Sequence, residues 1–141
     1  TVVQEGADLK VTVLHPEEKK DRSLWGLFGS LLQNMVEGVT KGFEKRLEMS
    51  GIGFKSEVKG KNLVLHIGYS HPVNFVVPAE VEIVMEKDVI VIKGIDKGLV
   101  GETAARIRAL KKPEPYQGKG IKYVGEIVRR KAGKAATKAA A

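Results

Sequence analysis

Histidine is the first residue type to consider for catalysis or metal binding, because its side chain titrates near neutral pH and ligates metals. The chain has three histidines, His15, His66 and His71, and no two have the i, i+4 spacing of paired ligands on a helix. His15 and His71 each precede a proline, and His66 lies in a strand pattern, so all three are typical of surface or turn residues. Cysteine is absent, which excludes thiolate catalysis, disulfides and cysteine-bound zinc. We therefore expect neither a metal site nor a cofactor.

Other catalytic residue types show no better arrangement. Glu44, Glu48 and Glu57 fall among lysines on alternating strand positions, which is the pattern of a solvated sheet face. Neither Ser50 nor Ser70 sits in a G-x-S-x-G elbow, and the glycine pairs at 51–53 and 118–120 lack the complete phosphate-loop pattern. No apolar run approaches the roughly 20 residues that cross a bilayer. The sequence therefore indicates neither an enzyme nor a membrane protein.

Positive charge is concentrated at one end of the chain. The 141 residues include 24 basic and 17 acidic side chains, for a net charge of +7. Residues 113–141 hold seven of the cations and two of the acids, so this fifth of the chain carries most of the surplus. A cationic end on a nearly neutral body is typical of a protein that binds a polyanion at one face, most commonly a nucleic acid.

The stretch 113–131, PEPYQGKGIKYVGEIVRRK, interleaves cations with aromatic residues and glycines. Two prolines hold the segment extended, glycines allow close backbone approach, lysines and arginines can neutralise phosphates, and tyrosines can contact sugars or bases. An ordinary charged surface is the alternative, but the interleaving favours RNA contact. The candidate RNA-binding residues are Tyr116, Gly118, Lys119, Gly120, Lys122, Tyr123, Arg129, Arg130 and Lys131.

The elements that must position this stretch follow from hydrophobic periodicity. Two short strands around residues 2–3 and 9–13 precede an apolar series with helical spacing, which predicts a helix from about 18 to 37 that ends near Gly38. A second helix is predicted over about 98–110, before Pro113. Between the helices, turn residues separate six predicted strands, at 43–49, 54–58, 63–67, 73–77, 81–85 and 89–92.

An internal repeat predicts two modules. A β-branched strand, a loop and the pattern D-[KR]-x-L-x-G occur at Asp21 and again at Asp96, 75 positions later. We interpret each aspartate as a helix N-cap, and Gly26 and Gly101 as points where a helix crosses close over a sheet. The predicted fold class is α+β, with two similar small modules, each a mainly antiparallel sheet packed against one helix, the first incomplete at its N-terminus. The predicted divisions are 1–42, 43–131 with the RNA-binding segment, and a flexible basic tail, 132–141.

Five segments together resemble the bacterial-type large-subunit ribosomal protein L-six family across nearly the whole chain. They are LLQNMVEGVTKGFEK at 31–45, GIGF at 51–54, GYSHPV at 68–73, IKGIDK at 92–97 and the stretch 113–131. The sequence departs from the family pattern at Gln117, where the family has lysine. The resemblance implies two α+β modules and a non-enzymatic structural constituent of the large subunit, bound to ribosomal RNA near the sarcin-ricin region where translational GTPases dock. Its partners would be that RNA and neighbouring ribosomal proteins, in the cytoplasm or in an organelle of bacterial descent.

Further expectations concern individual residues. Secondary RNA contacts are expected at Lys97, Tyr69, Ser70 and His71. Trp25 and Phe28 could serve the core of the first module or an interface between the modules. We favour the core, because Phe28 lies in the apolar helical stripe. Substitution of Gly118 or Gly120 should impair RNA docking more than stability, and deletion of 113–141 should leave the fold largely intact. The alternative function is a non-ribosomal RNA-binding module.

Overall fold

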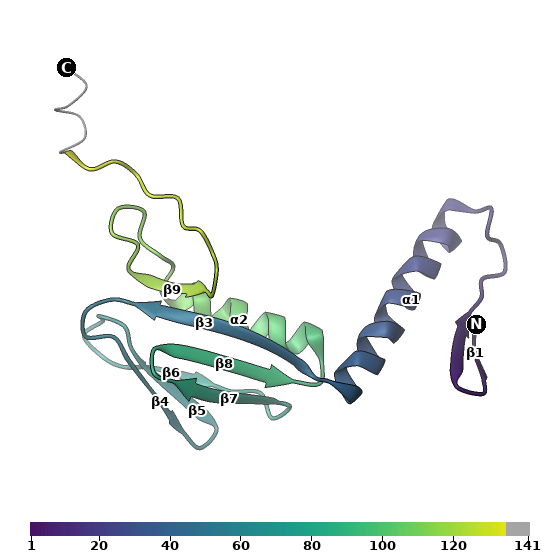
Figure 1. Cartoon of the computed structure of the whole chain (residues 1–141), viewed down its shortest axis with the longest axis horizontal. Coiled ribbons are helices and arrows are strands. Elements are labelled where there is room, and N and C mark those ends of the chain that lie inside the picture. Colours follow the sequence, from purple (N-terminus) through teal and green to yellow (C-terminus); the bar gives the residue numbers. More distant parts are fainter. Residues whose placement is uncertain (135–141) are drawn as a thin grey trace. The chain divides into compact units, whose positions relative to one another are not determined.

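The computed structural model of the chain describes residues 1–134 and divides it into two compact units, Thr1–Lys41 and a second that begins at Gly42 (Figure 1). Within the described residues the fold class is α+β, with two helices and antiparallel sheets, as predicted. Most of the predicted flexible tail, 135–141, lies outside the described residues. Each unit is described by itself.

The first unit is a β-hairpin followed by a long helix. Strands β1 (Val2–Glu5) and β2 (Asp8–Val11) pair antiparallel, with Val2 opposite Val11. Helix α1 spans Lys19–Thr40, and the indole nitrogen of Trp25 on this helix donates a hydrogen bond to the Val11 carbonyl oxygen, 2.8 Å away. Both predicted strands and the predicted helix are confirmed.

The predicted bounds of α1 are close to those observed, but the interpretation of Asp21 as its N-cap is wrong. The helix continues through Gly38 to Thr40, and the residue with a positive φ after it is Gly42, at 73°. At the other end the N-cap is Glu18, without a side-chain capping bond, and Asp21 lies inside the first turn. Asp21 therefore acts on the positive end of the helix dipole rather than as a cap.

This unit buries almost nothing. Gly38 is the one buried residue of α1, whereas Trp25 is 45% and Phe28 50% exposed. The predicted core positions of Trp25 and Phe28 are thus wrong for the chain described, because a hairpin of two four-residue strands is too small to cover a 22-residue helix.

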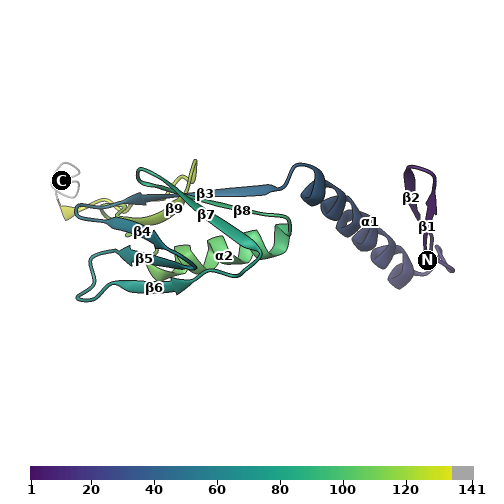
Figure 2. The same cartoon turned by 90° about the horizontal axis from the view of Figure 1, so that it is seen from below.

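Over residues 42–134, the second unit contains two antiparallel sheets and one helix. The four-stranded sheet has the order β7-β8-β3-β9, and the three-stranded sheet has the order β4-β5-β6. Figure 2 shows helix α2, Lys97–Leu110, along one face of the four-stranded sheet, with the three-stranded sheet beside it. The strands are β3 (Phe43–Ser50), β4 (Lys55–Lys59), β5 (Asn62–His66), β6 (Val73–Val76), β7 (Val81–Glu86), β8 (Val89–Gly94) and β9 (Gly120–Tyr123).

One hydrophobic core joins all three layers of this unit. Leu47 on β3, Leu65 on β5, Ile90 on β8 and Ile107 on α2 are each fully buried. Opposite faces of the sheet strands carry charged residues, because successive side chains alternate across a strand. This shared core holds the strands and α2 in fixed positions, and so it also positions the loops that connect them.

Helix α2 confirms one part of the repeat interpretation and corrects another. Asp96 is the N-cap, and its carboxylate accepts hydrogen bonds from the Gly98 and Leu99 amides. A Cβ atom on Gly101, or on Gly26 in α1, would meet no atom within 4 Å. Neither glycine therefore marks a close crossing of helix and sheet.

Strand β9 was not predicted. It pairs antiparallel with β3, Leu47 opposite Tyr123, and its Ile121 side chain is fully buried. Four residues of the candidate RNA-binding stretch are thus part of the sheet. The structure argues against the expectation that deleting 113–141 leaves the fold largely intact, since the deletion would remove an edge strand and a core side chain.

Candidate nucleic-acid interface

The loop between α2 and β9, residues 111–119, is closed by its own backbone. The Glu114 amide donates to the Lys119 carbonyl oxygen at 2.9 Å, and the Gly118 amide donates to the Glu114 carbonyl oxygen at the same distance. At the base of the loop the Ile121 amide donates to the Lys111 carbonyl oxygen at 2.8 Å. This bonding gives the loop a defined shape, in contrast to the extended segment expected from its prolines.

Two candidate residues, Gly118 and Gly120, are buried and shape this loop. Their φ angles are 73° and 149°, values that side chains disfavour. A Cβ on Gly120 would lie 2.7 Å from the Lys112 carbonyl oxygen, and one on Gly118 would lie 3.0 Å from the Arg130 guanidinium. A side chain at Gly120 would therefore collide with the protein's own backbone, so a substitution there should also reduce stability. The expected effect on RNA docking stays a prediction.

After β9, a partly buried ion pair lies where the chain turns. Arg108 on α2 donates from Nε and Nη2 to the two carboxylate oxygens of Glu126, and the Tyr123 amide donates to Glu126 Oε2 at 3.0 Å. The Arg108 guanidinium also lies 5.8 Å from the centre of the Tyr123 ring. Hydrogen bonds from Arg108 and from the Tyr123 amide lower the pKa of Glu126, and the bond to Glu126 raises the pKa of Arg108. Both groups therefore remain charged at neutral pH.

The basic segment that follows returns to the loop. The Lys131 amide donates to the Pro115 carbonyl oxygen at 2.8 Å, and Arg130 lies against Gly118. In Figure 1 this segment rises beside the loop that precedes β9. We call the resulting patch the C-terminal basic surface; its cations are Lys111, Lys112, Lys119, Arg129, Arg130 and Lys131.

The residues predicted as secondary RNA contacts lie in two different places. Tyr69 adjoins the C-terminal basic surface, because its hydroxyl donates to the Leu110 carbonyl oxygen at 2.9 Å and the Lys111 ammonium lies 4.6 Å from its ring centre. Ser70 and His71 follow Tyr69 in the same loop. Lys97 lies at the opposite end of α2 from Leu110, and the helical rise of 1.5 Å per residue separates these two residues by about 20 Å. The Lys97 ammonium lies over the Phe43 ring.

The predicted primary residues differ in what they can offer to a ligand. Tyr116, Arg129, Arg130 and Lys131 are exposed, and Lys119 and Tyr123 are half-buried. Lys122 lies on the outward face of the sheet, where its ammonium is 3.3 Å from the Glu48 carboxylate. A cation that already has an acidic partner is a weaker phosphate ligand than an unpaired one.

Sequence reasoning missed Lys111, Lys112, Arg108 and Glu126. The two lysines lie immediately before Pro113, so a candidate stretch that began at Lys111 would have included them. Arg108 and Glu126 are 18 positions apart and meet only because β9 packs beside α2. No local pattern signals such a pair.

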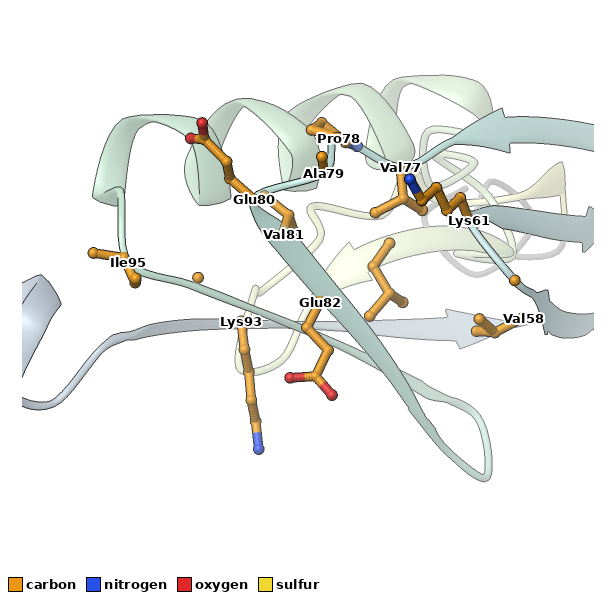
Figure 3. A pocket seen from close by; sticks show the side chains of 13 residues that line it. Val58, Lys61, Val77, Pro78, Ala79, Glu80, Val81, Glu82, Lys93 and Ile95 are labelled. Carbon is orange, nitrogen blue, oxygen red and sulfur yellow. The ribbon is translucent and has the colours of Figure 1, made fainter.

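A different groove lies along the edge strand β7 (Figure 3). Its lining is mainly aliphatic, including Val58, Val77 and Val81, and Glu82 and Lys93 point away from these towards the outward face of the sheet. Among residues 1–134 no three histidine or acidic side chains are grouped to hold a metal ion, and neither described helix is long and apolar enough to cross a membrane.

Comparisons with known proteins agree on one family. The sequence model described as Ribosomal protein L6 matches residues 50–124. The protein named large ribosomal subunit protein uL6 from Chlorobaculum tepidum is 53% identical over 139 residues, which cover 97% of this chain and 78% of that protein. Proteins of the same name from Synechococcus sp. JA-3-3Ab and Syntrophomonas wolfei are each 54% identical, over 94% and 98% of this chain and 74% and 77% of their own lengths.

These matches confirm the resemblance drawn from the five sequence segments and the expectation that the protein is not an enzyme. The identities are high and extend through both units, well beyond the range matched by the family model. The chain belongs to the ribosomal protein L6 family and is a structural constituent of the large ribosomal subunit.

Proposed function

We propose that the protein binds large-subunit ribosomal RNA through its C-terminal basic surface and holds that RNA in a fixed shape. The observation that carries the proposal is the hydrogen bond from the Lys131 amide to the Pro115 carbonyl oxygen. This bond brings cations from two separate segments together on a packed sheet, so that little ordering is required when RNA binds. Phosphate contacts of this kind supply most of the affinity for nucleic acid.

The position of this RNA within the subunit is a further part of the proposal. We infer from the family resemblance that it lies near the sarcin-ricin region, close to where translational GTPases dock, with neighbouring ribosomal proteins as additional partners. The bacterial relatives favour cytoplasmic ribosomes over those of an organelle. Chemical footprinting of subunits with and without the protein tests this location, because protection elsewhere alone would exclude it.

Salt-dependent binding tests the contact surface. The full chain is titrated with purified large-subunit ribosomal RNA at several salt concentrations, alongside a variant carrying Arg129→Gln, Arg130→Gln and Lys131→Gln. Loss of three phosphate contacts should make the log–log slope less negative by roughly 2 to 3, at about 0.7 to 0.9 per contact.

A charge-matched control separates a specific surface from general positive charge. Lys55→Gln, Lys59→Gln and Lys61→Gln remove three exposed lysines on or beside strands β4 and β5. This control should retain the wild-type slope. Equal slopes for both triple variants and the wild type would exclude the C-terminal basic surface as the contact region.

A non-ribosomal RNA-binding module is the alternative, since it would have the same basic patch. Such a module should bind unrelated structured RNAs as tightly as ribosomal RNA and should not co-sediment with large subunits. Gradient sedimentation of a cell extract, with the chain traced by mass spectrometry, separates the two functions.

A further inference from the structure

A groove beside the C-terminal basic surface lies between the Gly68–Tyr69 turn and loop 111–119. Phe54, Ile67 and Leu110 give it an apolar lining, and Lys111, Lys112 and Lys119 also line it. Its volume, about 670 Å³, is within the range of roughly 300 to 1,000 Å³ that small-molecule sites occupy. Apolar walls with cations match a ligand that has both a flat apolar part and an anionic part.

Tyr69 supplies a fixed aromatic ring in this groove. Its hydroxyl is bonded to the Leu110 carbonyl oxygen in the last turn of α2, where a carbonyl has no partner within the helix. The Lys111 ammonium lies near the ring, and yet Tyr69 remains 49% exposed. A ring that is held in place and still exposed can stack on a ligand with little loss of side-chain entropy.

The groove lysines remain available to an anion. Among the described residues, Lys111, Lys112 and Lys119 form no ion pair, whereas Lys122 is paired with Glu48. Glu114 is the one acidic side chain in the lining. The charge of the groove therefore favours a phosphate.

We propose that this groove holds one unpaired ribonucleotide of the bound RNA, with its base against Tyr69 and its phosphate near Lys112 and Lys119. Aromatic stacking combined with cations is the general means of binding unpaired bases, which a duplex does not present. The proposal rests on the proposed function, because it requires RNA to be bound at the adjoining surface. It adds a contact that depends on stacking rather than on charge.

The test compares Tyr69→Leu with Tyr69→Phe in the full chain, using large-subunit ribosomal RNA as the probe. Tyr69→Leu removes the ring and should weaken binding by roughly 5- to 150-fold, the range for loss of one stacked base, with the salt slope unchanged. Tyr69→Phe keeps the ring, loses the bond to Leu110, and should remain within about threefold of the wild type. Lys112→Gln should instead make the log–log salt slope less negative by about 0.7 to 0.9, the value for one phosphate contact.

A second measurement uses the wild type and so does not depend on the variants folding. RNA substituted with 4-thiouridine should crosslink to a peptide containing Tyr69, and an excess of unsubstituted single-stranded RNA should prevent this more effectively than duplex RNA. Wild-type affinity in the Tyr69→Leu variant, or crosslinks that avoid this peptide, would overturn the proposal while leaving the wider RNA surface in place. Absence of any ribosomal RNA binding by the wild type would instead overturn the proposed function.

Discussion

Alanine substitutions at three glycines near the C-terminal basic surface can distinguish the cost of backbone strain from the cost of a steric clash. Gly133 has ordinary φ and open space around its Cβ position, Gly125 has a φ of 86° with open space, and Gly120 combines a φ of 149° with contacts at 2.7 Å. Alanine at 133 should leave the free energy of unfolding unchanged. Alanine at 125 should cost about 1 kcal/mol and alanine at 120 at least about 2 kcal/mol. Urea denaturation of the three variants gives the order, and equal costs at 120 and 125 would show that the loop yields to a side chain.

Substitution of Gly101 by alanine should instead stabilise the fold. Gly101 lies in the interior of α2, and a Cβ there would meet no atom within 4 Å. Gly101→Ala should therefore raise the free energy of unfolding by about 0.5 to 1 kcal/mol through reduced backbone entropy in the unfolded chain. Thermal denaturation followed by far-UV circular dichroism provides the measurement. A lower melting temperature would mean that the helix needs a glycine at this point after all.

Residue types alone indicated a surface suited to RNA, but they did not show which side chains are paired or buried. The cations and tyrosines of 113–131 follow directly from composition, whereas the pairing of Lys122 with Glu48 requires the register of β9 against β3. Gly118 and Gly120 were interpreted as points of approach to RNA, because a sequence does not distinguish approach to a ligand from approach to the protein's own backbone. Their RNA role stays a prediction.

At the level of elements, the Arg108–Glu126 pair joins α2 to the start of the basic segment. Glu126→Gln should lower the free energy of unfolding by about 1 to 2 kcal/mol at pH 7, since it removes the charge from two bonds to Arg108. It should also speed exchange of the Lys131 amide hydrogen, whose bond to Pro115 depends on the path of the chain after Glu126. Hydrogen exchange measured by NMR reports this second effect.

The same pair predicts a pH dependence of known sign. Because the pKa of Glu126 is lower in the folded state than in the unfolded state, its stabilising effect is complete above the ordinary glutamate pKa and is lost as pH falls through the folded value. The difference in unfolding free energy between wild type and Glu126→Gln should therefore shrink as the solution is acidified below about pH 4.

A matched variant controls for surface ion pairs. Glu102 and Arg106 on α2 form an i, i+4 pair whose side chains are mostly exposed. Glu102→Gln should change the free energy of unfolding by less than about 0.5 kcal/mol. A difference for Glu126→Gln that stays constant to pH 2 would contradict the assigned role of its charge.

Helices and long strands were predictable because their apolar residues repeat over many positions. Strand β9 was missed because Gly120–Tyr123 offers only four residues, half of them glycine or lysine, and its one fully buried side chain is Ile121. The pairing with β3 is what makes these residues a strand. Likewise, two glycines lie near the end of α1, and the sequence does not show which of them follows the last turn. Gly38 keeps a helical conformation, whereas Gly42, just after the helix, has the positive φ that is typical of a C-terminal glycine.

At the level of the whole molecule, the repeat predicted two units of one kind, but packing differs sharply between them. The second unit has one core that joins two sheets and α2, with Leu47 and Ile107 fully buried. The first unit has an equivalent strand and helix without a comparable core. Periodicity describes which face of a helix is apolar, whereas burial depends on whether other elements cover that face.

This contrast predicts that the two units unfold separately in the isolated full chain. The single tryptophan, Trp25, lies in the first unit, and all three tyrosines, Tyr69, Tyr116 and Tyr123, lie in the second, so each unit has its own spectroscopic probe. With almost nothing buried in the first unit, tryptophan fluorescence should change at a lower urea concentration, and over a broader range, than tyrosine near-UV circular dichroism. Addition of ribosomal RNA should raise the tyrosine midpoint, because a ligand that binds only the folded state stabilises the unit that binds it. Coincident transitions for the two probes would show instead that the chain unfolds as a single cooperative unit.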